Sequence, residues 1–289
     1  MIPAETVHAL RQSQFIQTSS LALVLAYVLS VAANCLHGTS FFPRIEGVVP
    51  ISNFTYSGTR GPLELQSPIV LNNAAPKARS APILDIPSVG QAEFMNLGTT
   101  LEVTVGGTMF FGGQALQLKQ FHFHTPSEHR IDHEYFPLEM HLVHQADDGL
   151  ITVLALLFQL SETGTTTALL TAVAKNLADV TSPGTNTTTG ALDFNAVAKA
   201  AAAGPLFQYS GSLTTPPCMQ GVTFLVLAVP LPLDVWTYNR LKSVLKYNAR
   251  YTQNALGDTN LLVIAEEAPK LGKGPSGAPF LYYCHGKAR

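Results

Sequence analysis

Short apolar or alternating segments, separated by glycine, proline and asparagine, fill the chain between about Ile51 and Ile264, a pattern typical of β-strands. The clearest strand candidates are LEVTVGG, LQLKQFHFH, LEMHLVHQ, ITVLALLFQL and GVTFLVLAV. Helical spacing occurs in TTTALLTAVAKNLA, in DFNAVAKAAAA with Asp193 as a candidate N-cap, and in LDVWTYNRLKSVLKY with Asp234 as another. The pattern therefore predicts a β-dominated α+β fold with three short peripheral helices.

The two ends of the chain do not follow this pattern. Leu21 to Ala33 is an uninterrupted apolar run that suits a secretory signal and is too short to span a bilayer comfortably. We interpret residues 1–33 as a signal peptide, with an uncleaved anchor as the alternative. Residues 268–289, rich in glycine and proline, indicate a loosely ordered tail. We therefore expect one domain over residues 51–267 in a secreted protein, located in the cell wall or a periplasm-like extracytoplasmic space.

Composition limits the classes of partner. A chain of 289 residues that is 46% hydrophobic can bury a full core, and its length suits one large domain. The net charge of −2 and the absence of any Lys/Arg-rich block give no electrostatic reason to expect nucleic acid or an anionic membrane as partner. We expect a small-molecule ligand and no stable membrane span, and nothing in the sequence indicates an oligomeric state.

Three further features bear on the secretory interpretation. Triplets that begin at Asn53 and Asn186 match glycosylation sequons, which matter only in a eukaryotic secretory route. The latter lies in TSPGTNTTTG, which predicts an exposed loop over residues 181–190. The chain has three cysteines, an odd number for an oxidising compartment, so at least one is unpaired, removed with the signal or paired outside the chain. They are Cys35, Cys218 and Cys284.

The histidines are concentrated in one part of the chain. Six of the nine lie between His122 and His144. Alternate residues of a strand share a face, so His122 and His124 point the same way, while the phenylalanines that alternate with them enter the core. The next predicted strand, LEMHLVH, contributes His141, and antiparallel pairing of the two strands can bring it opposite the first pair.

Three neutral imidazoles that converge from two rigid strands match a catalytic zinc site, in which the fourth tetrahedral position is left to water. The cluster contains no cysteine, which argues against a closed structural zinc site of the finger type. The simpler alternative is a set of satisfied core histidines in a half-buried hairpin. Scattered histidines would not cluster in this way, so we favour zinc.

A second metal family also fits part of the pattern. His122 and His124, followed by Glu128, match the two-His-and-Glu arrangement of cupins. That fold normally adds a glycine after the glutamate, about where this chain has Tyr135, and a distant second motif with its own histidine. After the cluster the only histidine is His285 in the tail, so the cupin interpretation is not supported.

Three separated motifs, QFHFHTPSEH, EMHLVH and YSGSLTTPPC, together resemble the α-class carbonic anhydrases. The resemblance runs from about Phe54, through QSPIVL, to NARYTQN and beyond, and the short loop between the ligand strands is similar to the secreted fungal and bacterial branch. It implies a single domain around a large, twisted, mostly antiparallel sheet with short peripheral helices. It also implies a Zn²⁺ hydro-lyase, a carbonate dehydratase that converts carbon dioxide reversibly to bicarbonate and a proton.

The resemblance implies a role for each matching position of the metal site. The implied zinc ligands are the three that strand geometry selects: His122, His124 and His141. The hydroxyl of Thr214 would accept a hydrogen bond from the attacking hydroxide and donate its own proton to Glu128. Glu128 is therefore an orienting acceptor in this interpretation and not a ligand.

The resemblance also implies supporting residues and a substrate pocket. Gln120 would hold His122 and Glu139 would hold His141, as metal-bound imidazoles require. His129 would join Glu139 and Tyr209 in a buried structural network. Because carbon dioxide has no charge or strong dipole, the pocket beside the metal should be apolar. The implied pocket residues are Val143, Val153, Leu213, Thr215 and Phe224.

The chain departs from the family pattern at two places. The position where many members carry a proton-shuttling histidine corresponds to Thr99, which has no acid or base that works near neutral pH. Near residues 61–66 a segment is missing that usually carries a tryptophan and the cysteine partner of the position held here by Cys218. We therefore expect activity that depends on external buffer, and a chain less stable than its relatives.

Two other interpretations follow from these departures. The chain could be a carbonic-anhydrase-like protein retained for binding or adhesion with little catalysis, or an unstable product of an incomplete gene model. Members that abandon catalysis commonly lose a zinc histidine, and all three are present here together with Thr214 and Glu128. The sequence therefore favours the enzyme.

Overall fold

The computed structural model describes residues 36–51, 67–215 and 218–253. Thirteen strands, three α-helices and one 3-10 helix follow one another in this part of the chain. In chain order they are β1 Val70–Leu71, β2 Ile83–Asp85, β3 Glu93–Asn96, β4 Leu101–Thr104, β5 Thr108–Phe111, β6 Gln114–His124, β7 Arg130–Ile131, β8 Leu138–Gln145, β9 Ile151–Leu160, α2 Ala168–Ala174, η3 Leu177–Val180, β10 Asn186–Thr188, α3 Asn195–Ala203, β11 Leu206–Ser212, β12 Gln220–Leu227, β13 Leu231–Leu233 and α4 Val235–Leu245.

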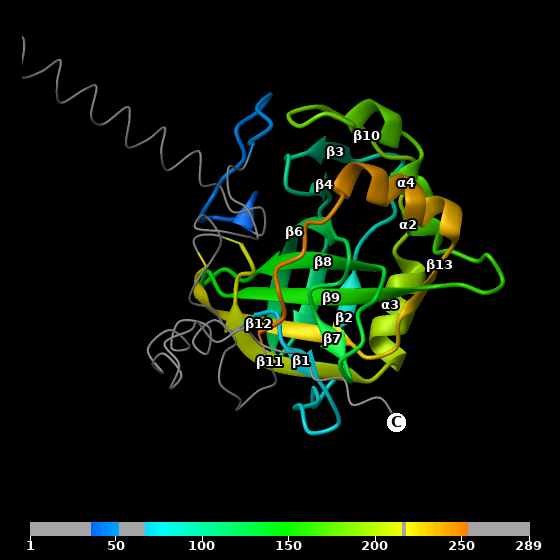
Figure 1. Cartoon of the computed structure of the whole chain (residues 1–289). Coiled ribbons are helices and arrows are strands. Elements are labelled where there is room, and N and C mark those ends of the chain that lie inside the picture. The colour runs from blue at the N-terminus through cyan, green and yellow to red at the C-terminus, as the bar shows by residue number, and fades with distance from the viewer. Residues whose placement is uncertain (1–35, 52–66, 216–217, 254–289) are drawn as a thin grey trace, which may run out of the picture.

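Eleven of the described strands form one large mixed sheet, in which the longest path runs β10-β3-β4-β6-β8-β9-β12-β11. The pairings are antiparallel except those of β12 and β13 with β9. Figure 1 shows the long strands β6, β8, β9 and β12 side by side, with α2, α3 and α4 together at one side of the molecule. The predicted mostly antiparallel, β-dominated α+β fold is confirmed.

The two faces of this sheet bury different sets of side chains. One face, which includes Phe121 and Leu142, packs with apolar residues of all three helices, for example Val173, Val197 and Leu241. The other face carries a second apolar cluster that includes Val143. On β8, Leu142 and Val143 are adjacent and belong to opposite clusters, as strand geometry requires. The second face, which we call the site face, also carries the histidines described below.

The helices begin close to where the pattern predicted. Asp234 caps α4, since its Oδ1 accepts a hydrogen bond from the backbone N–H of Thr237 at 2.8 Å. The prediction of Asp193 as the N-cap of α3 is wrong. The cap residue is Phe194, because Asp193 instead forms a short turn in which its Oδ1 accepts from the N–H of Asn195.

The stretch predicted as an exposed loop over residues 181–190 contains a short strand, β10, which pairs with β3 at the edge of the sheet. The loop prediction was therefore wrong for Asn186–Thr188, because pairing with β3 overrides the local preference of a threonine- and glycine-rich segment. The predicted signal peptide and tail lie outside the described residues, as do Cys35, Cys284 and the sequon at Asn53.

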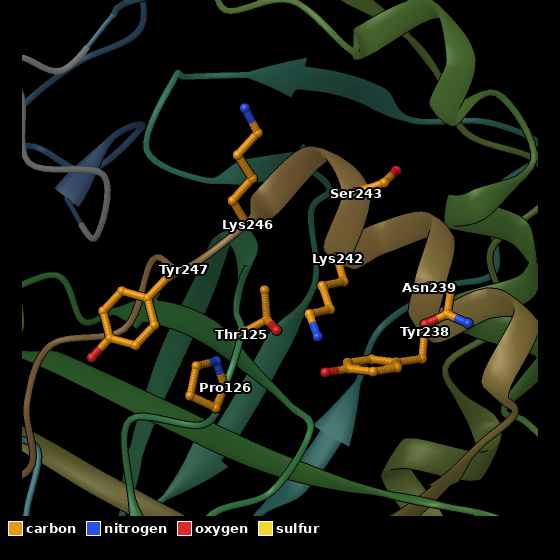
Figure 2. Close-up of a pocket in the computed structure, with 8 residues that line it drawn as sticks. All are labelled: Thr125, Pro126, Tyr238, Asn239, Lys242, Ser243, Lys246 and Tyr247. Carbon is orange, nitrogen blue, oxygen red and sulfur yellow. The ribbon is translucent and has the colours of Figure 1, made fainter.

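Within the described residues, every helix is too short or too polar to cross a membrane. A cavity of about 670 Å³ lies beside α4, lined by residues of that helix and by Thr125 and Pro126. Figure 2 shows the side chain of Lys242 extending toward Tyr238 within this cavity. The three clustered histidines do not line it, so it is distinct from the site that follows.

Candidate metal centre

Strands β6 and β8 bring three histidines together on the site face. His122 and His141 stand directly opposite each other in the antiparallel register, which places their Cβ atoms roughly 5 Å apart. His124 lies two residues beyond His122 on the same face of β6. The ring centroids are 5.1 Å apart for His122 and His124, 5.3 Å for His122 and His141, and 4.7 Å for His124 and His141.

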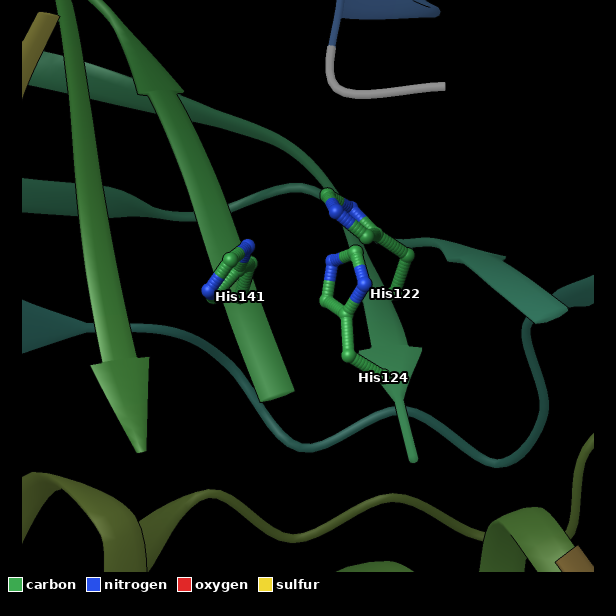
Figure 3. Close-up of side chains that lie close together, drawn as sticks. All are labelled: His122, His124 and His141. Atoms are coloured by element: carbon green, nitrogen blue, oxygen red, sulfur yellow. The ribbon is translucent and has the colours of Figure 1, made fainter. Parts of the chain in front are cut away.

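Each of these three rings offers one nitrogen that lies within 4.8 Å of the others. Figure 3 shows the imidazoles of His122 and His124, from one strand, and that of His141, from its neighbour, turned toward a common space. Nitrogens bound to one zinc ion at about 2 Å in tetrahedral geometry lie less than 4 Å apart, so small side-chain rotations suffice to reach a shared ion.

Burial favours the neutral form of the His122 and His124 imidazoles. All three side chains are at most 1% exposed. Burial, reinforced by His124 and His141, holds the pKa of His122 well below its usual value, although Glu139 acts in the opposite direction. Burial also lowers the pKa of His124, although Glu128 opposes this shift. A neutral imidazole is the form that binds a metal, so burial of His122 and His124 favours their metal-binding form.

In each ring one nitrogen is held by a hydrogen bond, which fixes the tautomer. Nδ1–H of His122 donates to Oε1 of Gln120 at 2.9 Å, and Nδ1–H of His124 donates to the carbonyl oxygen of Asn248 at 3.0 Å. His141 is turned the other way, and its Nε2–H donates to Oε1 of Glu139 at 2.7 Å. A ring nitrogen that carries a proton cannot bind a metal, so His122 and His124 would bind through Nε2 and His141 through Nδ1.

The donor set fits zinc. Nε2 of His124 is buried and has no hydrogen-bond partner among the described residues, which is costly unless something occupies the position beside it. In catalytic zinc sites three neutral imidazoles bind the ion, the second nitrogen of each ring donates a hydrogen bond to an acceptor, and the fourth coordination position stays open. The residues present therefore fit this ion.

A second group of potential ligands is better explained by hydrogen bonding. His129, Glu139 and His141 also offer atoms within 4.8 Å of one another. Oε1 of Glu139 is, however, 2.6 Å from Nδ1 of His129 and 2.7 Å from Nε2 of His141, distances at which an N–H lies between the two atoms. This group is therefore a support for His141 and not a separate metal site.

The hydrogen-bond network that holds His141 extends from Glu139 away from the metal centre. Oε2 of Glu139 accepts from the backbone N–H groups of Glu128 and His129 at 2.7 and 2.8 Å. Nε2 of His129 lies 2.7 Å from the hydroxyl of Tyr209, which donates to Ser67 at 3.0 Å. Although burial favours the neutral carboxyl, His129 and His141 hold the pKa of Glu139 well below its usual value. Glu139 is thus an anion surrounded by donors.

Glu128 is buried beside this centre, and Thr214 and Thr215, which follow β11, are buried as well. Oε1 of Glu128 lies 3.4 Å from Nδ1 of His124 and accepts from the backbone N–H of Arg250 at 2.9 Å. Its other oxygen, Oε2, is buried without a partner among the described residues, as is Oγ1 of Thr215. Thr214 is completely buried. Glu128 therefore retains hydrogen-bonding capacity beside His124.

The implied apolar pocket residues gather on the site face. Val143, Val153, Leu213 and Phe224 belong to one apolar cluster and are at most 2% exposed. Val153 is the register partner of both Val143 on β8 and Phe224 on β12. The ring of Phe224 is 6.0 Å from that of His141, so a continuous apolar surface begins beside the third histidine.

Asn248 is a functional residue that the sequence analysis did not identify. Its side chain accepts from the N–H of Thr125 at 2.7 Å and donates to the carbonyl oxygens of Thr99 and Phe123 at 3.0 and 2.8 Å. It thereby fixes the carbonyl that holds His124. It is 124 residues away from that ligand in sequence, so no local spacing could reveal it. Thr99, at the position where many family members carry the shuttle histidine, is thus attached to the same support through its carbonyl oxygen.

Comparison with known proteins gives a consistent result. A family model described as eukaryotic-type carbonic anhydrase matches residues 62–260. A carbonic anhydrase from Pectobacterium atrosepticum is 35% identical over 184 residues, which cover 63% of this chain and 72% of that protein. A fungal α-carbonic anhydrase structure from Aspergillus oryzae aligns with a TM-score of 0.70 and 40% identity, over 75% of this chain and 99% of the other. An α-carbonic anhydrase from Thermovibrio ammonificans, in complex with the inhibitor sulfanilamide, aligns with a TM-score of 0.61 and 32% identity, over 72% and 97%.

Proposed function

The chain belongs to the eukaryotic-type carbonic anhydrase family, and we propose that it is a carbonate dehydratase that uses zinc to convert carbon dioxide reversibly to bicarbonate and a proton. One observation carries the proposal: ligand nitrogens of His122, His124 and His141 lie within 4.8 Å of one another on two paired strands. The outer nitrogen of each ring is held by its own acceptor.

Zinc, when bound, lowers the pKa of water to about 7 and so makes hydroxide available at neutral pH. The residues of the chain then have to orient the nucleophile and admit the substrate. Gln120, Glu139 and the carbonyl of Asn248 hold the three imidazoles in the tautomer and orientation that turn the other nitrogen of each ring toward the shared space. Without these acceptors the rings could rotate, and metal affinity would fall.

We propose that Thr214 and Glu128 orient the nucleophile. Glu128 has one oxygen that accepts from Arg250 and one buried oxygen, Oε2, without a partner among the described residues. A hydroxyl that donates its proton to such a carboxylate can only accept a hydrogen bond from the nucleophile. Thr214 would act in this way and so direct the attacking lone pair toward carbon dioxide.

We propose that carbon dioxide binds against Val143, Val153, Leu213 and Phe224. An uncharged molecule with no strong dipole gains little from polar groups, whereas an apolar surface beside the metal excludes competing water. Oγ1 of Thr215, which has no partner among the described residues, would donate to bicarbonate as it forms.

The alternative function is that of a binding or adhesion protein with little catalysis, since similar chains can lose catalysis. Such a loss commonly removes a zinc histidine, and this chain keeps all three at the meeting point of β6 and β8. The alternative is therefore not favoured.

The test is to measure zinc content and stopped-flow carbon dioxide hydration of the purified protein, together with inhibition by sulfanilamide. We expect one zinc per chain, rapid hydration and inhibition. His122→Asn should abolish hydration and reduce zinc content. His133→Asn is the matched control, since His133 is exposed and has a positive φ that asparagine tolerates. Parental activity in His122→Asn, or a zinc-free parent that is fully active, would contradict the proposal.

We also propose that the mature protein acts outside the cytoplasm, because Leu21 to Ala33 has the length and apolarity of a secretory signal. Asn186, in one sequon, is exposed on the edge strand β10, a position that a glycosylating enzyme can reach. Mass spectrometry of protein collected from a secreting eukaryotic host should find an N-terminus near Ala33. Retention of Met1 in protein isolated from the cytoplasm alone would contradict this location.

A further inference from the structure

Residues Leu36–Arg44, which we call the upstream segment, precede the residues that match the family model and nevertheless pack on the site face. Leu36, His37 and Thr39 are at most 5% exposed. In Figure 1 the segment is the blue chain that lies beside the ends of β4 and β6. Its contacts reach three neighbouring strands, β4, β6 and β8, two of which carry the clustered histidines.

The first contact is with β4 and β6. Nδ1 of His37 is 2.6 Å from Oε1 of Glu102, and Glu102 stands directly opposite His122 in the register of β4 with β6. Residues that stand opposite each other share a face of the sheet, so His37 is bound next to the first metal-centre histidine. Arg44 donates to the carbonyl of Lys119 on β6 at 2.9 Å, and its Nη2 lies 3.5 Å from Oε1 of Glu102.

The second contact is with β8. The backbone N–H of Ser40 donates to Oε1 of Gln145 at 2.8 Å, and Nε2 of Gln145 donates back to Oγ of Ser40 at 2.6 Å. Gln145 is four residues beyond His141 on one continuous strand, so both side chains point to the site face. The upstream segment therefore crosses from β4 to β8 over the face that carries the metal centre.

The third contact is apolar. Leu36 is 1% exposed and belongs to the same apolar cluster as Val143, Val153 and Leu213, the residues proposed above to receive carbon dioxide. A side chain of this size fills part of the space that a larger ligand would need. The upstream segment thus contributes to the wall of the substrate pocket as well as to its cover.

A buried carboxylate of the sheet pairs with side chains of the upstream segment, which explains why the segment packs there. Glu102 is completely buried, and a buried carboxylate is costly unless it is paired. Burial raises its pKa, and His37 and Arg44 act against that shift. Both partners come from the upstream segment, so the buried acid of the sheet is paired with side chains that these residues supply.

The turn of the upstream segment also depends on its sequence. Gly38 has φ +81°, and a Cβ at this position would lie 2.8 Å from Nε of Arg44. Only glycine adopts this backbone conformation without strain and leaves room for the guanidinium. Replacement of Gly38 should therefore displace Arg44 and loosen the segment without altering any residue of the metal centre.

We propose that the upstream segment determines which ligands reach the metal centre, by admitting carbon dioxide and small anions and excluding ligands with a large aromatic group. The proposal rests on the proposed function, since it concerns access to the same zinc. The three histidines are at most 1% exposed with the segment in place. A linear triatomic molecule needs little space beside them, whereas a naphthalene ring needs much more, and Leu36 and His37 are packed around the same residues.

The test compares binding of azide, a small anion, with binding of dansylamide, a fluorescent naphthalene sulfonamide, to the zinc-loaded full chain. His37→Ala and Gly38→Ala should tighten dansylamide binding at least about tenfold, a change of about 1.4 kcal/mol, with azide binding unchanged. Gly47→Ala is the matched control, because Gly47 has a similar φ of +72° and no atom within 4 Å of an added Cβ. Equal dansylamide affinity in the parent, His37→Ala and Gly38→Ala would overturn the proposal.

A second measurement uses the unaltered chain and does not depend on how the variants fold. Dansylamide at saturating concentration should increase amide hydrogen exchange in residues 36–44, because the segment must leave for the ring to enter, whereas azide should not. Unchanged exchange with bound dansylamide would overturn the proposal. If neither probe binds the zinc-loaded chain, the proposed function itself fails, and this outcome is distinct from the others.

Discussion

At the scale of single residues, the orientation of the three clustered histidines depends on the acceptors that hold their outer ring nitrogens. His122 and His124 are turned by acceptors at Nδ1, and His141 by an acceptor at Nε2. The acceptors differ in origin: an amide side chain two residues away, a carboxylate two residues away and a carbonyl oxygen 124 residues away. Two of them follow from strand alternation, and the third does not.

Removal of the Gln120 amide should weaken the metal site without unfolding it. In Gln120→Ala, the Nδ1–H of His122 loses its acceptor, so the ring is no longer held in the binding tautomer. We expect zinc affinity to fall about tenfold or more, measured by competition with a chromophoric chelator. Gln91→Ala is the control, since Gln91 is exposed and should leave zinc affinity unchanged. Parental affinity in Gln120→Ala would show that the amide does not orient the ligand.

Thr99 leads to a prediction about proton transfer. Its hydroxyl neither gains nor loses a proton near neutral pH, so protons should leave the site mainly through external buffer. Stopped-flow hydration rates should therefore rise steeply with buffer concentration in the parent. Thr99→His should raise the rate at low buffer about tenfold or more. Rates that are independent of buffer in the parent would contradict this expectation.

His144 leads to a prediction about acid stability. Burial lowers its pKa from 6.5 to about 4, although hydrogen bonds to the backbone act in the other direction. In the unfolded chain this histidine takes up a proton below pH 6.5, whereas in the folded chain it stays neutral until about pH 4. Its contribution is therefore fully present above pH 6.5 and is lost as the pH falls toward 4, by about 2 kcal/mol at pH 5.

Urea denaturation of the parent and of His144→Leu between pH 4.5 and 7.5 measures this contribution. The Nε2 of His144 is buried without a partner among the described residues, so an apolar residue of similar size should be tolerated at pH 7. The parent should lose more free energy of unfolding on acidification than the variant. Identical pH dependence of the two proteins would assign the acid sensitivity to other groups.

At the scale of elements, the last four residues of β6 alternate phenylalanine and histidine between the two faces of the sheet. Phe121 and Phe123 are completely buried in the cluster under the helices, while the histidines between and beyond them face the metal centre. A slip of one residue in register would exchange the two sets. The apolar core therefore fixes which side chains reach the candidate metal centre.

Phe121→Ala should accordingly lower the stability of the fold that holds the ligands. We expect a loss of about 3 to 5 kcal/mol in the free energy of unfolding, because the ring is completely buried and contacts Phe123 and Phe194 edge to face. Phe110→Ala, on the neighbouring β5, is the control, since that side chain is 46% exposed. Chemical denaturation of both variants in the zinc-free form checks this, and equal losses would contradict the assignment.

At the scale of the whole molecule, the family resemblance predicts a missing segment near residues 61–66, which lie outside the described residues. Loss of a native disulfide costs about 2 to 5 kcal/mol, comparable with the stability of many domains. A variant with the family segment restored, including its cysteine, should therefore melt at a higher temperature than the parent under oxidising conditions. The gain should shrink under reducing conditions. Equal midpoints for both chains in both conditions would show that the segment is dispensable.

The sequence by itself determined the local features of this protein: the alternation that makes β6 and β8 strands, the cap of α4 at Asp234, and the shared face of His122 and His124. These depend on residues two to four positions apart, whose geometry is set by backbone stereochemistry. The sequence by itself did not show which distant residues contact the histidines and the buried Glu102. Asn248 reaches His124, and His37 reaches Glu102 from 65 residues away, only because the folded sheet brings them together.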